Sequence, residues 1–168
     1  MNLPKDFLLL VTIFAALGCG LIGGLLFAFS NFVMKALSHQ PPESSIRTMQ
    51  AINVYILNPL FLAIFLGTAL ATAILAVAAI LRLSNPGMLC FLTGCAFYLI
   101  GVLGVTMMFN VPLNNALALQ DPGTAAAAQY WLIYVSKWMA WNHVRTLASL
   151  GAAAFLILAI HWAYSPLK

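Results

Sequence analysis

The sequence predicts an all-α fold, namely a four-helix up-down-up-down transmembrane bundle that forms one integral membrane domain over residues 1–168. Hydrophobic residues make up 64% of the chain and charged residues only 6%, against roughly 25% charged residues in an ordinary soluble domain. The mean hydropathy is +1.01. Four apolar runs each offer the roughly 20 helical residues that a bilayer requires. Two of the four helices are expected to be long and to extend beyond the membrane on one side.

The first spanning helix is expected at residues 7–34. This apolar run is too long for the hydrophobic region of a signal peptide, so we interpret it as a membrane helix. Gly20 and Gly24 form a pair of small residues four positions apart, which predicts a close helix crossing. We expect this crossing to lie within one monomer, while a homo-oligomer formed through it remains an alternative.

The second helix is expected to begin beyond a pair of prolines, with Ser44 or Ser45 as its N-cap. It is first amphipathic and then apolar, and it spans the membrane at residues 59–81. Pro59 interrupts it and frees the carbonyl of Tyr55, which predicts a kink in one long helix.

The third helix is expected at residues 88–109, after a tight turn at residues 82–87 that contains Asn85-Pro86-Gly87. Pro112 interrupts the chain beyond this helix. For the fourth helix, Asp121 is the expected N-cap, with Pro122 at the first helical position. This helix is expected to be amphipathic at first and to span the membrane at residues 147–164.

The charge pattern favours contact with a lipid bilayer and argues against nucleic acid. The net charge is +4, but the seven basic residues are scattered and form no basic cluster. Lys5, Arg82 and Lys168 mark the side of both termini, and several basic residues on the other side are better assigned to a polar cluster. The positive-inside rule then places both termini in the cytoplasm.

Common catalytic and metal-binding patterns are absent from the sequence. The three acidic residues all fall in loops or near an end of the chain: Asp6, Glu43 and Asp121. They cannot form a carboxylate pair or a triad. The three cysteines lie in apolar runs without metal-ligand spacing, and we interpret them as core residues. A haem held by two histidines is disfavoured, since His143 and His161 lie far apart on the last helix. We therefore expect neither a metal nor a cofactor.

Polar side chains gather at one end of the predicted bundle. Solvation explains the polar residues of the loops there, but it explains less well the amides that lie beside prolines and inside helices. The candidate binding residues at this end are Asn31, Arg47, Asn58, Phe109, Asn110, Asn114, Trp138 and Trp141. For Asn58 and Asn110 a structural alternative stays open, in which each amide braces a carbonyl that Pro59 or Pro112 frees.

The segment Lys137–Thr146 supplies the remaining candidates, Asn142, His143 and Arg145. At about 100° per residue, Trp138, Asn142 and Arg145 share one helix face, whereas His143 points about 100° away from Asn142. We predict that Arg145 lies inside the bundle, hydrogen-bonded to Asn110 or Asn114 and to Asn58. The alternatives are that Arg145 snorkels to the lipid headgroups and that the tryptophans form a membrane-interface belt.

Five segments together resemble the anthrone oxygenase-like family of small four-helix membrane proteins, most of whose bacterial members have no assigned function. The segments are Phe27-Ala28-Phe29-Ser30-Asn31-Phe32-Val33-Met34, Met49-Gln50-Ala51-Ile52-Asn53, Leu57-Asn58-Pro59-Leu60-Phe61, Asn110-Val111-Pro112-Leu113-Asn114 and Trp141-Asn142-His143-Val144-Arg145-Thr146. The resemblance covers nearly the whole chain. It implies oxidation of an anthrone to an anthraquinone by dioxygen without a known cofactor, in a bacterial cytoplasmic membrane.

Such chemistry requires an apolar slot, a base, and hydrogen-bond donors for a developing oxyanion. Aromatic walls would come from Phe109, Trp138 and Trp141, and donors from Arg145, Asn142, Asn110 or Asn114. His143 would be the base, or else a structural hydrogen-bonder, because it points away from the donors. Two function classes therefore remain. One is an oxygenase or oxidase acting on a lipophilic phenolic, anthrone- or quinone-like molecule. The other is a non-catalytic membrane protein that binds a hydrophobic ligand or lipid, or that is purely structural.

Overall fold

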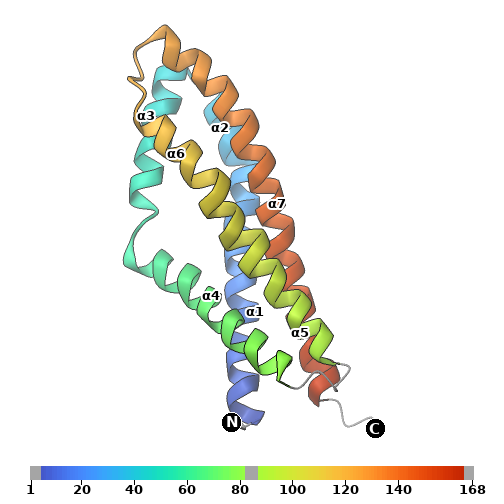
Figure 1. Cartoon of the computed structure of the whole chain (residues 1–168). Helices are drawn as coiled ribbons and strands as arrows, with labels where there is room; N and C mark the ends of the chain where they lie inside the picture. The colour runs from blue at the N-terminus through green and yellow to red at the C-terminus, as the bar shows by residue number, and fades with distance from the viewer. Residues whose placement is uncertain (1–4, 82–86, 165–168) are drawn as a thin grey trace.

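The computed structural model describes residues 5–81 and 87–164, and throughout these two ranges the chain is helical apart from short loops, with no strand (Figure 1). Four helical segments are long and apolar enough to cross a membrane: Asp6–Ser38, Pro59–Ile80, Gly87–Ala118 and Ala125–His161. The predictions of an all-α protein and of four such helices are confirmed.

The first segment consists of α1 (Lys5–Ala28), the π-helical turn η1 (Phe29–Val33) and α2 (Met34–Ser38). The close approach of this segment to its neighbours involves Gly18 and Gly23. A Cβ atom added at Gly23 would lie 3.0 Å from Leu150 Cδ2 in α7, whereas one added at Gly20 or Gly24 would meet nothing within 4 Å. The close crossing expected in this stretch is present within the monomer, but Gly23 makes it, and not Gly20 and Gly24.

The second segment is two helices, α3 (Pro42–Tyr55) and α4 (Pro59–Ile80), and the prediction of one long kinked helix is wrong. Pro59 has no N–H, and it forces the residue before it out of the helical region. Asn58 is accordingly extended, with φ −83° and ψ 159°. The chain changes direction at this break (Figure 1). Ser45 does not cap α3 either, because it lies inside the helix and its hydroxyl donates to the Leu37 carbonyl at 2.6 Å.

The third segment runs through α5 (Gly87–Ala96), the π-helical segments η2 (Phe97–Gly104) and η3 (Thr106–Asn110), and α6 (Val111–Ala118). It does not end at Phe109 as expected. Pro112 lies in the first turn of α6, directly after the π-helical turn η3, so the irregular hydrogen bonding accommodates its missing N–H without a break. Of the turn expected at residues 82–87, only Gly87 falls within the described residues.

The fourth segment is α7 (Ala125–Tyr164), a single helix of 40 residues. Its first turn is capped by Thr124, whose hydroxyl accepts a hydrogen bond from the Ala127 N–H at 3.1 Å. Asp121, the expected N-cap, instead accepts from the Gly123 N–H at 3.2 Å within the preceding turn. Thr124 is the N-cap because its hydroxyl oxygen accepts from the N–H three residues later in the sequence, and this N–H has no partner within the helix.

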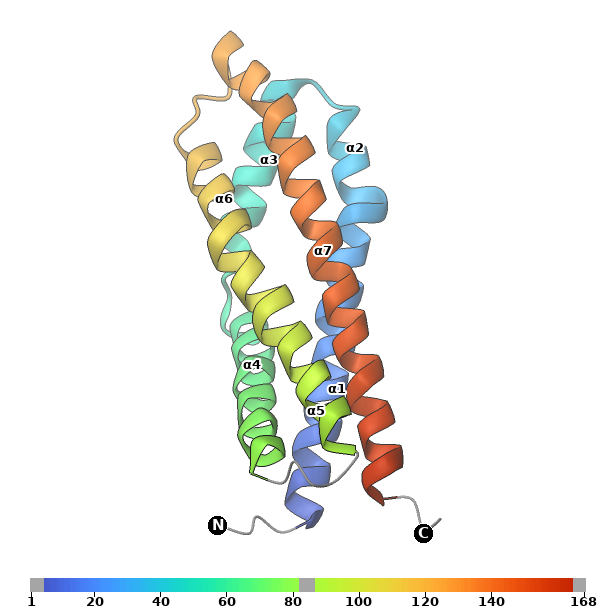
Figure 2. The same cartoon turned by 45° about the vertical axis from the view of Figure 1, so that its right-hand side comes forward.

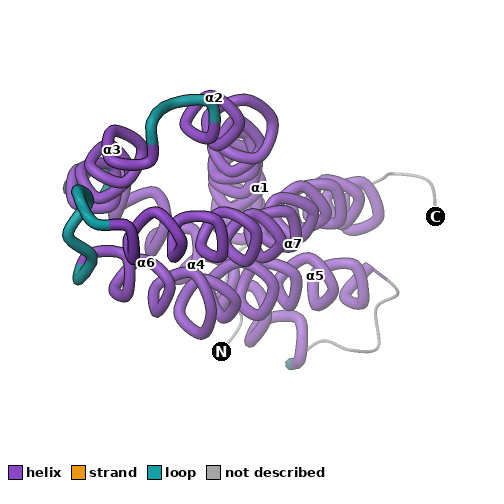
Figure 3. The backbone as a smooth tube through the Cα atoms, turned by 90° about the horizontal axis from the view of Figure 1, so that it is seen from above, coloured by secondary structure: helices purple, strands orange, loops and turns teal. Residues whose placement is uncertain are grey.

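The start of α1 and the end of α7 lie at the same end of the molecule, and α2, α3, α6 and the beginning of α7 lie at the other (Figures 1 and 2). α7 packs against α1, α3, α5, α6 and all three π-helical segments, whereas α4 packs against α1, α5 and η2. Viewed from above, α7 lies between α1 on one side and the α5–α6 segment on the other (Figure 3).

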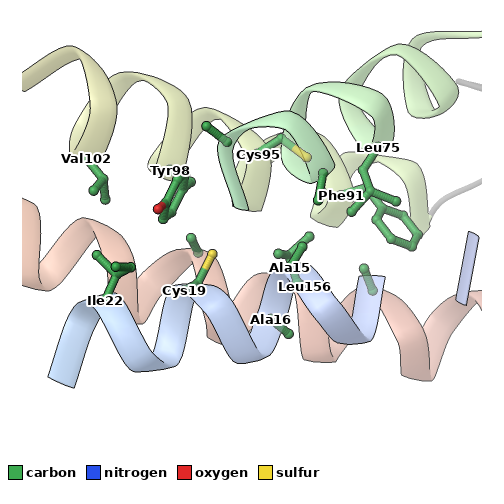
Figure 4. Packing of buried hydrophobic residues seen from close by; sticks show 14 of the residues in the cluster. Ala15, Ala16, Cys19, Ile22, Leu75, Phe91, Cys95, Tyr98, Val102 and Leu156 are labelled. Atoms are coloured by element: carbon green, nitrogen blue, oxygen red, sulfur yellow. The ribbon is translucent and has the colours of Figure 1, made fainter. Parts of the chain in front are cut away.

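Two separate clusters of buried apolar side chains form the interior. The first, which we call the lower cluster, is contributed by α1, α4, α5, η2 and α7, and it includes Cys19, Cys95 and Tyr98 (Figure 4). The second, which we call the upper cluster, lies among α2, α3, α6 and the first half of α7, and it includes Met34 and Trp131.

Candidate functional site

A layer of buried polar side chains separates the lower cluster from the upper one. On α7 the upper cluster ends at Met139 and the lower cluster begins at Ala148. Between them Asn142, Arg145 and Thr146 are all buried. Since buried polar groups are costly unless they are hydrogen-bonded, such a layer requires an internal set of partners.

Arg145 is at the centre of this layer and is only 6% exposed. Its Nη2 donates to Asn142 Oδ1 at 2.6 Å and its Nη1 to Thr106 Oγ1 at 3.2 Å. Its Cζ lies 5.3 Å from the centroid of the Trp138 ring, within the range of a cation–π interaction. The prediction that Arg145 points into the protein is confirmed. The partners predicted for it, Asn58, Asn110 and Asn114, are wrong.

The charge of Arg145 is surrounded by neutral groups. Both of its hydrogen-bond partners are uncharged. Of the three acidic residues, Glu43 pairs with Arg47 at 2.9 Å on the exposed side of α3, and Asp6 and Asp121 are exposed near the two ends of the molecule. A buried charge without an opposite charge costs several kcal/mol even after relaxation. The arrangement therefore favours an anionic partner beside Arg145.

Asn142 holds Arg145 in place and ties α7 to the first segment. Its Nδ2 donates to the Leu26 carbonyl at 2.8 Å and to Ser30 Oγ at 2.7 Å. Because both amide hydrogens are used on this side, the amide oxygen must face the Arg145 guanidinium. Asn142 thus fixes the orientation of the guanidinium.

Trp138 borders the layer on the side of the upper cluster. The side-chain amides of Asn110 and Asn114 both hydrogen-bond to it. Its indole Nε1 donates to Asn114 Oδ1 at 3.0 Å, and its carbonyl accepts from Asn110 Nδ2 at 3.3 Å. The same Asn114 oxygen accepts from the Tyr134 hydroxyl at 2.9 Å. The ring of Phe29 lies 5.7 Å from that of Trp138. Trp138 is thus an aromatic ring held in a fixed position beside a buried cation.

Three of the four buried side-chain polar atoms that lack a hydrogen bond in the described residues belong to this region. Arg145 Nε and Asn53 Nδ2 are donors, and Asn110 Oδ1 is an acceptor. Asn53 interacts with the nearby Tyr134, which leaves Arg145 Nε and Asn110 Oδ1 as the atoms of this layer without a partner among the described residues. Buried polar atoms without partners are rare, and each calls for an explanation such as a bound water or ligand. Their concentration here indicates where a polar ligand would bind.

The π-helical turns η1 and η3 lie at the level of this layer. η1 contains Ser30, and η3 contains both Thr106 and Asn110. Single π turns inside α-helices are frequently found at functional sites. Two such turns from separate segments, one bonded to Asn142 through Ser30 and one to Arg145 through Thr106, support the assignment of this layer as the candidate site.

Four of the candidate residues from the sequence are not brought into this layer. His143 is exposed on the outer face of α7, as is Asn31 on η1. Arg47 pairs with Glu43 at the surface. Asn58 is also exposed, and its amide accepts from the Phe61 N–H and donates to the Tyr55 carbonyl, both at 3.0 Å. For Asn58 the structural alternative, bracing of the carbonyl that Pro59 frees, is confirmed.

Phe109 and Trp141 lie together at the edge of the layer. Their rings are stacked with centroids 3.6 Å apart and an interplanar angle of 8°, and both side chains are partly exposed. This pair is consistent with the interfacial belt that was the alternative interpretation of Trp141.

Sequence reasoning missed several residues of the site: Ser30, Asn53, Thr106 and Tyr134. Each lies in a run where a core or surface residue was expected. On α3, Asn53 and Gln50 are partly buried while Arg47 and Val54 are exposed. The helix therefore turns Asn53 toward the interior, and not Arg47, which was the candidate from this stretch.

Comparison with known proteins identifies one family. The model of a family described as anthrone oxygenase matches residues 60–155, more than half of the chain. The match includes the Asn110–Asn114 and Trp141–Thr146 segments. No curated protein and no solved structure matches the chain.

Proposed function

Because the chain belongs to the anthrone oxygenase family, we propose that it is a membrane-embedded oxygenase that oxidises a lipophilic phenolic, anthrone- or quinone-like molecule with dioxygen and without a cofactor. The substrate would reach the protein from the lipid bilayer. The observation that carries this proposal is the buried, uncompensated cation of Arg145 beneath the Trp138 ring.

The proposed reaction generates negative charge where Arg145 can stabilise it. Loss of a proton from the CH₂ group of an anthrone gives an anion whose charge lies largely on the ketone oxygen. Positioned donors aimed at such an oxyanion are often the largest single contribution to catalysis. Arg145 Nε has no hydrogen-bond partner among the residues that the structure describes, and Asn142 and Thr106 hold the rest of the guanidinium in place.

The overall change balances without any other reactant. The substrate anion transfers electrons to dioxygen, and a C–O bond forms to give a hydroperoxide once the proton returns. Loss of water from this hydroperoxide breaks the O–O bond and leaves a carbonyl at the former CH₂ carbon. One dioxygen is consumed, and one quinone and one water are formed. The protein's contribution is to bind the ring system and to stabilise the anion.

We further propose that the four helical segments form an up-down-up-down bundle in a bacterial cytoplasmic membrane, with both termini in the cytoplasm. The basic residues Lys5, Arg82 and Lys168, which the sequence pattern assigns to the side of the termini, support this orientation. A reporter fused to the C-terminus that is active only in the cytoplasm should be active. Activity of a reporter that requires export would refute the orientation.

The activity is tested by oxygen uptake and quinone formation when anthrone is added to the purified protein in lipid nanodiscs. Wild-type protein should accelerate both in a one-to-one ratio above the rate with empty nanodiscs. Arg145→Gln should lose most of this rate, whereas Arg47→Gln should retain it, since Arg47 is paired at the surface. Saturable anthrone binding with no oxygen uptake would favour the alternative of a non-catalytic protein that binds hydrophobic ligands.

A further inference from the structure

The proposed reaction begins with loss of a proton, and the structure restricts which group can take it. The titratable side chains nearest to Arg145 are those of α7 and of the helices packed against it. Tyr134 is close to Arg145 on the same helix, and Trp138 lies beside both: its ring centroid is 6.4 Å from that of Tyr134 and 5.3 Å from Arg145 Cζ. We therefore first consider whether Tyr134 can act as a base.

Hydrogen bonding fixes Tyr134 as a donor. An indole N–H can only donate, so the Asn114 atom 3.0 Å from Trp138 Nε1 must be the amide oxygen. That same oxygen lies 2.9 Å from the Tyr134 hydroxyl. Since an amide oxygen can only accept, the Tyr134 hydroxyl must carry its proton and donate it. A residue held in this way is not available as a proton acceptor.

The other titratable groups of the described residues are exposed or belong to the two apolar clusters. Tyr130 packs against the upper cluster, with its ring centroid 6.5 Å from that of Tyr134, and Cys90 packs against the lower cluster. His143 and Lys137 are exposed on the outer side of α7. Cys19, Cys95 and Tyr98 belong to the lower cluster, where the Tyr98 hydroxyl donates to the Phe65 carbonyl at 3.0 Å. The remaining histidines are exposed near the two ends of the molecule. The acidic residues are also exposed, as described above. Arg145 is thus surrounded by groups that stabilise an anion and by none that removes a proton.

We propose that this site takes up its substrate as an anion formed without a protein base, so that the acidity of the substrate itself determines which molecules the protein oxidises. This inference rests on the proposed function, because it concerns the same site. The class of substrate is then a lipophilic carbon acid or phenol that ionises within reach of neutral pH once it lies beside a cation. Weaker acids of the same shape stay neutral in the site, and they are therefore not oxidised.

The experiment is an anaerobic pH titration of anthrone in nanodiscs, in which the visible absorbance of the anthrone anion is followed. A neighbouring opposite charge favours the ionised form by about 1 to 3 pH units. Anthrone bound to wild-type protein should therefore ionise at a pH lower by that amount than anthrone in empty nanodiscs. Arg145→Gln should lose this shift, and Arg145→Lys, which keeps a charge, should retain part of it.

Two further variants separate the proposal from a protein base. Lys137→Gln and His143→Gln, both at exposed positions of α7, should keep the lowered ionisation pH and the rate at which the anion appears. Loss of anion formation in either variant, an unchanged ionisation pH in Arg145→Gln, or failure of anthrone to bind the wild-type protein would overturn the proposal.

Admission of air distinguishes this inference from the proposed function. If the anion forms but no oxygen is consumed, the oxygenase proposal fails while the anion site stands. The other outcome is that oxygen is consumed at a rate that does not follow, across pH, the fraction of anthrone in the anionic form. In that case the inference fails while the oxygenase proposal stands. For substituted anthrones at one pH, each unit of weaker acidity should lower the rate about tenfold.

Discussion

Replacement of Gly18 by alanine should destabilise the protein at the crossing of α1 and α4. A Cβ atom at Gly18 would overlap Thr68 Oγ1 and would lie 3.1 Å from Thr68 Cβ and 3.2 Å from Thr68 Cγ2. Thr68 is fully buried, and its branched side chain has few rotamers to turn to. The two helices must therefore separate, which disturbs the packing of the lower cluster around them.

The magnitude follows from a comparison with Gly24→Ala. Both substitutions gain about 1 kcal/mol of helix propensity, but a Cβ at Gly24 meets nothing within 4 Å. The propensity gain cancels between the two variants, so their difference in unfolding free energy is the cost of overpacking, about 1 to 3 kcal/mol. Gly18→Ala should be the less stable variant by this amount.

The assay is reversible unfolding in mixed micelles with increasing denaturing detergent, combined with a double-mutant cycle. Thr68→Ala alone measures the cost of removing the Thr68 hydroxyl, which interacts with Tyr98. Combined with Gly18→Ala it should remove the overlap, with a coupling of about 0.5 to 3 kcal/mol between the two sites. Equal stability of Gly18→Ala and Gly24→Ala, or additivity in the cycle, would refute the reasoning.

Three further substitutions have expected outcomes. Asn58→Ala removes the N-cap of α4 and should lower the unfolding free energy by about 1 kcal/mol, measured in the same micelle assay; no loss would mean that the cap does not stabilise the break. Gln50→Leu removes the two hydrogen bonds from Gln50 Nε2 to the carbonyls of Leu117 and Gln120, at 2.9 and 3.0 Å. It should raise amide hydrogen exchange in the α6–α7 loop about tenfold, given about 1 to 1.5 kcal/mol for the contacts; protection equal to wild type would contradict this. Glu43→Gln breaks only an exposed ion pair and should change stability by less than about 0.5 kcal/mol, and a larger loss would show that the pair contributes more than its exposure implies.

The four apolar segments and the burial of Arg145 could be predicted because each depends on local composition. A run of about 20 apolar residues has few other folds open to it. Similarly, the positions of Trp138, Asn142 and Arg145 on one face follow from regular helix geometry, and α7 is in fact regular over its 40 residues. Where the helix is regular, the periodicity argument succeeds.

The partners of Arg145 could not be predicted, because they depend on the third segment, which is irregular. Tyr98, Val102, Thr106, Asn110 and Asn114 follow one another at steps of four residues. In an α-helix each such step turns the side chain by about 40° from the previous one, or about 160° over the four steps. The π-helical segments η2 and η3 take up this drift. No sequence pattern predicts these π-helical segments, so Thr106 was not predicted to face α7.

The break between α3 and α4 was foreseen only in part. Pro59 marked the position, but a proline alone does not distinguish a kink from a break. Two features produce a break here. The Asn58 side chain replaces two lost backbone hydrogen bonds. In addition, α3 packs against α6 and α7 and does not continue the line of α4. Such tertiary contacts are not encoded in any local pattern.

The π-helical turn η3 has a consequence for how this site could arise and be lost. A π turn corresponds to one residue more than the α-helix on either side of it requires. Deletion of a single codon within Thr106–Asn110, for example that of the exposed Met107, would return the segment to a plain α-helix and leave the two flanking stretches in their original phase. The protein would keep its fold and its place in the membrane, yet Thr106 could no longer face Arg145 while Asn110 bonds to the Trp138 carbonyl. The ancestral protein could thus have been an ordinary helical membrane protein, to which one inserted residue gave the buried polar layer.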